Sequence, residues 1–394
     1  MDDLSPQFHF VLASDSLKGT LSSAEAEGLL EAAAHAHFPN ATCACVPMAD
    51  GGEGTVDAVV AAMGGEMRSV RVHDPLGRPV EARYGLLGSG RAIIEMAAAS
   101  GLTLLGPDER NPLRASTYGT GELISDALMQ GCTDVSLAVG GSATNDGGMG
   151  CARALGVRFL DGEGRELGGC GADLGRVGTI DASGLDPRVA AASFHAMCDV
   201  DNPLVGPGGA SFVFGPQKGA SPEIVEELDR GMRSYAHVLE ATFGKGFDVP
   251  GAGAAGGLGA GCLAFLGATL ESGIGSVLGL VGFDATLEGA ALCVTGEGRL
   301  DSQTAHGKVI SGVAATCKRR GVPCVAIVGG VARGTSPADV DGLVAVVPTP
   351  DGPMPLEEAL GNAEELYAAA AERLFSIVAI GVTEGLRSAV PGTC

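Results

Sequence analysis

The stretch VGGSATNDGGMG (residues 139–150) follows the apolar run 135–139 and holds five glycines, two hydroxyl side chains, one amide and one carboxylate. It predicts a β-strand that opens into a loop formed largely of backbone. Because glycine has no Cβ, the N–H groups of such a loop can turn inward and bind phosphate or carboxylate oxygens. Residues 150–155 resemble the start of a helix, whose N-terminus adds partial positive charge at the same place. A Gly-rich turn without a ligand is the alternative.

Length and charge limit the class of protein. The chain has 394 residues, of which 45% are hydrophobic, enough for a substantial core in two or three domains. A net charge of −22 argues against nucleic acid and anionic membrane surfaces as partners. There is no uncharged apolar run of about 18 residues, and the acidic N-terminus lacks the basic region of a signal peptide. We therefore expect a cytoplasmic protein.

The cysteines indicate a reducing environment. The chain has 11, scattered from Cys43 to Cys394, and none forms a CxxC pair. This pattern is typical of reduced, mostly buried thiols rather than a disulfide framework or a zinc site.

Other acidic and Gly-rich segments also follow predicted strands. DGGEG (residues 50–54) follows the expected strand 41–46 and repeats the pattern DGGMG (residues 146–150). Asp15 and Lys18 lie between the expected strand 8–13 and a helix that begins with a capping box, Ser22 to Glu25. Ligands bind at the carboxyl ends of strands in open α/β sheets. A solvated turn is the alternative for Asp15 and Lys18.

Two further acidic residues follow the apolar run 193–198. Asp199 and Asp201 are two residues apart, so in an extended segment they point the same way. Such a pair either shares a cation or raises one pKa, and a kinase needs both a metal ligand and a base. An exposed acidic turn before Pro203 is the alternative.

The last third of the chain has the clearest α/β pattern. Strands are expected at 291–294, 322–328 and 343–347, with a helix ending near residue 320 and a long helix from about residue 356. The first of these strands leads into a connection that contains Glu297, Arg299, Asp301, Ser302 and Lys308. Gly307-Lys308 resembles the end of a Walker motif, but the neighbouring residues do not fit it.

The middle of the chain is less regular. Residues 70–84 predict a hairpin, and residues 92–99 fit either a strand or a buried helix start. GAGAAG (residues 251–256) satisfies the dinucleotide pattern GxGxxG but has no strand before it. It favours a close backbone contact or a pliable helix start.

Taken together, these features fit a site for phosphates and Mg²⁺. Phosphoryl transfer needs donor and acceptor in line, a metal, cations for the developing charge and a carboxylate for the acceptor proton. The sequence offers candidate residues for each of these requirements, but no candidate identifies the acceptor molecule.

Nine separated motifs resemble, in order and over essentially the whole chain, those of the bacterial glycerate kinases that phosphorylate the 2-hydroxyl. They are ASDSLKGTLSSAEA, PMADGGEGTVDA, DPLGRPVEARYG, STYGTGELI, VGGSATNDGGMG, CDVDNPLVGPGGA, FGPQKGA, GAGAAGGLGA and TGEGRLDSQTAHGK. The chain departs from the family pattern at Leu17, where Phe is usual, and at Val309-Ile310, where a small residue and Pro are usual.

The resemblance implies ATP-dependent phosphorylation of D-glycerate with Mg²⁺, giving 2-phosphoglycerate. It implies an α/β fold of two domains with the active-site cleft between them. A Rossmann-like α/β/α domain is expected from residues 1–70 and 285–394, and an inserted α/β domain from residues 71–284. The expected partners are small molecules, D-glycerate and ATP. Whether the chain forms a homodimer stays open.

Residue roles follow as hypotheses. We assign Lys18 and Arg299 to the substrate carboxylate or the transferred phosphoryl group, because a small acid needs a fixed cation in so acidic a protein. Asp199 is the first choice of base, with Asp50 and Asp301 as competitors. Asp146 and Asp201 are the expected Mg²⁺ ligands. The expected nucleotide contacts come from one loop: Gly140, Gly141, Ser142, Asn145, Gly147 and Gly148.

Three alternatives stay open. Phosphorylation could occur at the 3-hydroxyl or on another small hydroxy acid. A nicotinamide-dependent oxidoreductase would use the 251–256 pattern, and a non-catalytic sensor would bind an organic acid without turnover.

Overall fold

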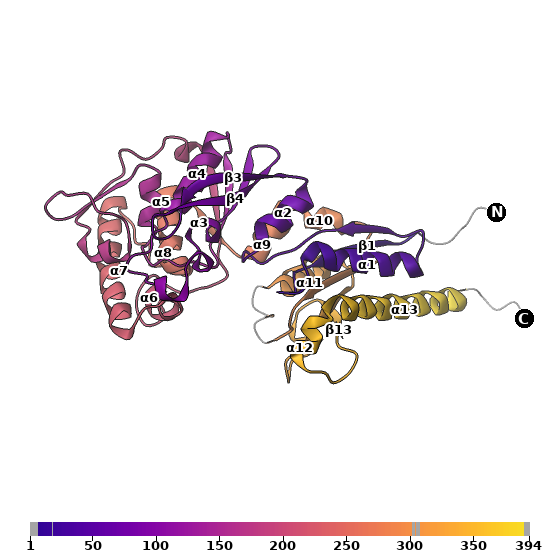
Figure 1. The fold of residues 1–394 in the computed structure, drawn as a ribbon. Helices are drawn as coiled ribbons and strands as arrows, with labels where there is room; N and C mark the ends of the chain where they lie inside the picture. The colour runs from indigo at the N-terminus through magenta and orange to yellow at the C-terminus, as the bar shows by residue number, and fades with distance from the viewer. Residues whose placement is uncertain (1–6, 18, 302–303, 305–307, 390–394) are drawn as a thin grey trace, which may run out of the picture. The chain divides into compact units, whose positions relative to one another are not determined.

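The computed structural model describes residues 7–17, 19–301, 304 and 308–389, without the side chains of 384–389. The chain forms two compact units (Figure 1), one from Met1–Asp50 with Val277–Cys394 and the other from Gly51–Ser276. The first division precedes the helix α2 (Thr55–Met63), whereas the boundary predicted from the sequence follows residue 70. The physical reason is that α2 packs on strands β4 (Pro79–Leu87) and β5 (Arg91–Glu95) of the second unit. The second division follows Ser276, whereas the boundary predicted from the sequence follows residue 284.

The first unit is built on a five-stranded parallel sheet. Its strand order is β13, β12, β11, β1, β2, formed by β1 (His9–Ser14), β2 (Thr42–Cys45), β11 (Leu292–Glu297), β12 (Cys324–Val328) and β13 (Leu343–Pro348). Its helical segments are α1 (Ser23–His37), α10 (Phe283–Thr286), α11 (Val309–Arg320), α12 (Leu356–Gly361), α13 (Ala363–Ala389) and a 3₁₀ turn at Pro337–Asp339. Helix α9 (Gly273–Leu280) contains the second division.

Helices cover both faces of this sheet. Alternate strand residues such as Phe10 and Val294 share a buried cluster with α1 and α13, which lie side by side in Figure 1. The intervening residues, such as Cys293, point to the other face, where α11 packs on β11 and β12. Because α1 and α11 follow the neighbouring strands β1 and β11 on opposite faces, the winding of the chain reverses between these two strands. Ligands of doubly wound sheets bind at such a reversal.

Helix α13 is the one helix among the described residues that is long and apolar enough to cross a membrane. The stretch Ala363–Thr383 has a mean hydropathy of 1.4, but a core helix of a soluble protein meets the same criterion. Here its residues Tyr367 and Phe375 are fully buried against the sheet of the first unit.

The second unit contains a six-stranded mixed sheet. Its strand order is β10, β9, β6, β5, β4, β3, with β3 (Glu66–His73), β6 (Asp134–Ala138), β9 (Ser193–Met197) and β10 (Thr269–Glu271) beside β4 and β5. Strands β7 (Arg158–Leu160) and β8 (Thr179–Asp181) form a separate pair. The other helices are α3 (Ala97–Ser100), α4 (Tyr118–Met129), α5 (Met149–Ala154), α6 (Ala210–Phe214), α7 (Pro222–Phe243) and α8 (Ala254–Gly261), which continues as a π-helix, Cys262–Leu266. Short 3₁₀ turns lie at Leu102–Leu104, Pro107–Glu109, Gly171–Arg176, Val189–Ala191 and Pro216–Lys218.

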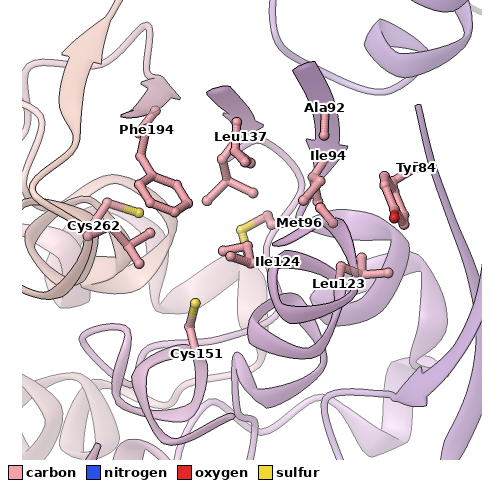
Figure 2. Packing of buried hydrophobic residues seen from close by; sticks show 14 of the residues in the cluster. Tyr84, Ala92, Ile94, Met96, Leu123, Ile124, Leu137, Cys151, Phe194 and Cys262 are labelled. Atoms are coloured by element: carbon pink, nitrogen blue, oxygen red, sulfur yellow. The ribbon is translucent and has the colours of Figure 1, made fainter. Parts of the chain in front are cut away.

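One of the buried clusters of the second unit lies between the sheet and its helices. Figure 2 shows Ile94 and Leu137 of neighbouring parallel strands beside Leu123 and Ile124 of α4. Phe194 of β9 extends the same cluster toward the π-helix. The structure therefore confirms the predicted α/β fold class.

Local predictions hold where a short motif determines the backbone. Helix α1 begins at the predicted capping box, and β3 and β4 form the predicted hairpin. Residues 92–99, which fitted two elements, contain both: the end of β5 and the start of α3.

The GAGAAG segment makes a close backbone contact, as expected. A Cβ at Gly256 would lie 2.1 Å from the carbonyl oxygen of Thr144, and one at Gly257 would lie 2.9 Å from the Cα of Gly147. Ala255, Gly256 and Gly257 all have positive φ. These glycines therefore let α8 support the 139–150 loop.

Replacing Gly256 by Ala should destabilise the second unit by several kcal/mol, because the overlap with Thr144 adds to the cost of a left-handed backbone. Gly244→Ala is a matched control, since Gly244 has the same φ of 71° and a Cβ there would meet nothing within 4 Å. It should cost about 1 kcal/mol. Urea unfolding followed by circular dichroism measures both, and equal losses would contradict the packing explanation.

Candidate active site

A pocket of about 350 Å³ lies in the first unit, at the carboxyl ends of β1 and β11. The two strands pair in parallel from Phe10 with Leu292 to Ser14 with Gly296, and the N–H of Asp15 donates to the carbonyl of Gly296 at 2.9 Å. This register brings the residue after β1 beside the last residue of β11. The pocket therefore lies where the winding of the sheet reverses.

The charged residues that line this pocket are of both signs. They are Asp15, Asp50, Glu297, Arg299 and Lys308. Clustered carboxylate oxygens are the ligands that Mg²⁺ prefers, and Arg and Lys are the cations that bind phosphate and carboxylate groups. The chemistry of the lining thus fits a metal-bound phosphate beside a small acid.

Glu297 is the most perturbed carboxyl group in the pocket. It is 5% exposed, and burial raises its pKa to about 7, although the Thr304 hydroxyl and nearby Lys308 oppose the rise. The Thr304 hydroxyl donates to Glu297 Oε1 at 2.5 Å and accepts from the N–H of Asp301 at 3.0 Å. Glu297 can therefore take up or release a proton near neutral pH.

The cations of the pocket lie on the same connection. Lys308 precedes the first residue of α11, and its Nζ lies 3.7 Å from Oδ1 of Asp301. Arg299 is exposed, two residues after Glu297. A negatively charged ligand in this pocket would have access to both cations and to the positive end of α11.

The 139–150 loop of the second unit is mostly buried. Asp146 is 0% exposed and accepts four hydrogen bonds: from the N–H and hydroxyl of Thr117 at 2.7 and 2.8 Å, and from the N–H groups of Gly148 and Gly150 at 3.0 and 3.2 Å. Burial raises the pKa of Asp146, while these bonds favour the carboxylate. The carboxylate thus ties the loop to the start of α4.

The glycines of this loop fall into two groups. The N–H of Gly147 donates to Gly256, and a Cβ at Gly148 would lie 2.9 Å from the Cα of Gly261. These two residues pack within the protein. Gly140 and Gly141 are partly or fully exposed, and a Cβ at Gly140 would lie 3.2 Å from the carbonyl oxygen of Gly51. The structure thus places one Gly-rich motif directly against the other.

A buried lysine donates two hydrogen bonds to the middle of the 139–150 loop. The Nζ of Lys218 donates to Ser142 Oγ at 2.6 Å and to the Thr144 carbonyl at 2.7 Å. Burial lowers the pKa of Lys218 to about 7. Asn145 donates its amide to Ser211 Oγ at 3.1 Å, and its buried Oδ1 has no hydrogen-bond partner within the described structure.

Asp199 and Asp201 follow β9 and are exposed. Asp199 Oδ1 accepts from the N–H of Gly273 at 2.7 Å. A Cβ at Gly51 would lie 3.2 Å from the Cα of Gly273. Asp199 therefore lies near the place where Gly51 meets Gly140.

The predicted site residues thus fall into two sets. In the first unit, Asp50 and Arg299 line the pocket and Asp301 contacts Lys308. Lys18 lies outside the described residues. The second set lies in the second unit: Gly140, Gly141, Ser142, Asn145, Asp146, Gly147, Gly148, Asp199 and Asp201.

Three pocket residues had no assigned role in the sequence analysis: Asp15, Glu297 and Lys308. All three had been placed at carboxyl ends of strands. Local sequence patterns did not show that β1 and β11 are neighbours, because the whole second unit separates them in the chain.

Comparison with known proteins agrees with the motifs. The sequence model described as the Glycerate kinase family matches residues 10–379. A glycerate kinase of Bacillus subtilis is 45% identical over 378 residues, covering 95% of this chain and 98% of that protein. A glycerate 2-kinase of Escherichia coli is 44% identical over 374 residues, covering 94% and 98%.

A solved structure is also similar. It is a crystal structure of a Salmonella typhimurium LT2 protein whose designation as glycerate kinase 2 is provisional. It superposes with a TM-score of 0.88 at 44% identity, covering 96% of this chain and 100% of that one. By sequence and by structure, this chain belongs to the glycerate kinase family.

Proposed function

We propose that this protein is a kinase that transfers the γ-phosphoryl group of ATP to the 2-hydroxyl of D-glycerate, with Mg²⁺. Family membership supports a kinase acting on glycerate, and the name of the Escherichia coli relative favours the 2-hydroxyl. The structural observation that carries the proposal is the pocket between the ends of β1 and β11, with three carboxylates and two cations.

Arg299 and Lys308 are the proposed contacts of the substrate carboxylate and the transferred phosphoryl group. Arg can bind a carboxylate through two parallel hydrogen bonds, which would orient a small acid. Lys308 is a compact charge at the start of α11, suited to the charge that develops on the phosphoryl oxygens. Lys18 remains a predicted contact of the substrate carboxylate or the transferred phosphoryl group.

Asp15 and Asp50 are the proposed holders of Mg²⁺ in the first unit, since both are carboxylate residues that line the pocket. Bound Mg²⁺ would neutralise charge on the β- and γ-phosphates. Asp201 stays a predicted ligand. For Asp146 we propose a structural role instead, because its four hydrogen bonds come from the chain itself.

Glu297 is our preferred base over Asp301. Its pKa of about 7 suits a group that accepts the hydroxyl proton as the oxygen attacks phosphorus. Asp301 is instead close to Lys308 Nζ. Asp199, the first choice from sequence, remains a competitor for the role of base. Comparing kcat of Asp199→Asn with kcat of Glu297→Gln tests the two candidates.

Gly140 and Gly141 are the proposed contacts of the nucleotide phosphates, with Ser142 and Asn145 beside them. Both glycines lie at the exposed end of the loop, against the second Gly-rich motif. Gly147 and Gly148 are proposed as packing residues, because the contacts they make are internal. Such a reaction needs only small-molecule partners, which is consistent with a cytoplasmic location.

Purified protein with ATP, Mg²⁺ and D-glycerate should release ADP and form a product that enolase converts directly to phosphoenolpyruvate. A coupled assay with enolase added alone measures this. Product that becomes an enolase substrate only after phosphoglycerate mutase is added would assign the 3-hydroxyl, and absence of glycerate-dependent ADP would contradict the kinase proposal.

Lys308→Met should lower kcat/KM for glycerate by roughly 10²-fold or more, because a cation facing developing charge is lost. Lys318→Met is the matched control on the same helix, since Lys318 is exposed and pairs with Asp341. It should stay within about twofold of the unsubstituted enzyme. Similar kinetics for the two variants would remove Lys308 from the site.

Glu297→Gln should change how stability depends on pH. Between about pH 4.5 and pH 7 the folded protein keeps a proton on Glu297 that the unfolded chain releases, so the free energy of unfolding falls as pH rises. The Gln variant lacks this term, which amounts to a few kcal/mol. Urea unfolding midpoints from pH 4.5 to 8 should diverge between the two proteins up to about pH 7, whereas parallel curves would refute the raised pKa.

A further inference from the structure

Three cysteines meet in the core of the first unit, away from the pocket. Cys293 is on β11, Cys317 on α11 and Cys324 on β12, and each is 0% exposed. Their three sulfur atoms all lie within 4.8 Å of one another. No disulfide joins them.

The fold brings these three cysteines together. Cys293 and Cys324 are register partners on neighbouring parallel strands, so their side chains point to the same face of the sheet. That face is covered by α11, whose last turns carry Cys317. Cys293 is the second residue of β11, whereas Glu297 of the pocket is its last. The thiols and the pocket thus occupy opposite ends of this strand.

The spacing of the sulfurs suits a single ion. Three atoms within 4.8 Å of one another share a centre no more than about 2.8 Å from each, close to the metal–sulfur bond of about 2.3 Å known for Zn²⁺. Shifts of a few tenths of an ångström would close the difference. A site with three sulfur ligands selects soft ions.

We propose that Cys293, Cys317 and Cys324 form a binding site for a soft, thiophilic ion, with trivalent arsenic as the ion that fits best. Three thiolates carry three negative charges, and an unbalanced charge in a buried site is costly. A trivalent ion makes the complex neutral, whereas a monovalent or divalent ion leaves net negative charge.

The chemistry balances without an oxidant or a reductant. Arsenous acid, As(OH)₃, reacts with three thiols: three S–H and three As–O bonds break, and three As–S bonds and three water molecules form. The oxidation states of arsenic and sulfur do not change.

Access requires only local opening. Cys317 immediately precedes the exposed residues 318–321 at the end of α11, and Cys324 follows exposed Pro323. The turn between α11 and β12 is therefore largely exposed and directly adjoins two of the three cysteines in the chain. Opening of such a helix end is far less costly than global unfolding.

The test uses the full-length, reduced protein carrying Cys43→Ser and Cys45→Ser, which removes the two cysteines of β2. After incubation with arsenite under native conditions, excess arsenite is removed and the intact chain is weighed by native mass spectrometry. The expected product gains one arsenic atom and loses three hydrogens. Its thermal unfolding temperature should also rise with arsenite concentration, because the fold holds the three thiols together and so binds the ion more tightly than the unfolded chain does.

Cys317→Ala and Cys132→Ala, each in this background, separate the site from general thiol chemistry. Cys132 is a buried thiol of the second unit, and its variant should keep the full arsenic mass and the thermal shift. Cys317→Ala should bind arsenite roughly tenfold more weakly or worse, without the product that lacks three hydrogens. Its own melting temperature without arsenite shows that it is folded.

Three outcomes would overturn the proposal. They are absence of arsenic on the folded background protein, equal uptake by Cys317→Ala, and a product in which two cysteines have formed a disulfide instead. None of these measurements depends on kinase activity, so the result is independent of the proposed reaction.

Discussion

The parallel pairing of β1 with β11 is the interaction on which the candidate site depends. Its register sets Ser14 opposite Gly296, and the next backbone hydrogen bond, from Asp15, places two acidic loops at one edge of the sheet. A slip of one residue would turn the buried faces of these strands outward, so the core of the unit specifies the register. The position of the pocket thus follows from how the buried faces of these strands pack.

Burial gives the polar residues different tasks in the two units. Glu297 accepts a hydrogen bond from the Thr304 hydroxyl, and its pKa of about 7 lets it exchange a proton near neutral pH, which suits a catalytic base. Asp146 is more completely enclosed but accepts four hydrogen bonds, which suits a structural role. Both are acidic residues close to glycines in the sequence. Their burial and the number and origin of their hydrogen bonds tell them apart.

Much of the fold could be predicted from local patterns, because short-range physics produces it. The capping box at Ser22 and the start of α7, with Ser221 as cap and Pro222 in the first turn, are readable from a few residues. Other features depend on partners far along the chain. A Gly-rich motif does not reveal whether its N–H groups face a ligand or the protein, as Gly140 and Gly147 show. The convergence of Cys293 with Cys317 and Cys324 likewise needs the sheet to be assembled.

The discontinuity of the first unit has a consequence for synthesis on the ribosome. Strand β1 leaves the exit tunnel early, but its partner β11 emerges only after the whole of Gly51–Ser276. During that interval the apolar strand has only β2 beside it, while the inserted unit already has all the strands of its own sheet. Domains generally fold as units while the chain is still growing. The inserted unit can therefore fold first and hold the two flanking segments at its adjacent ends, which shortens the effective loop that β1 and β11 must close.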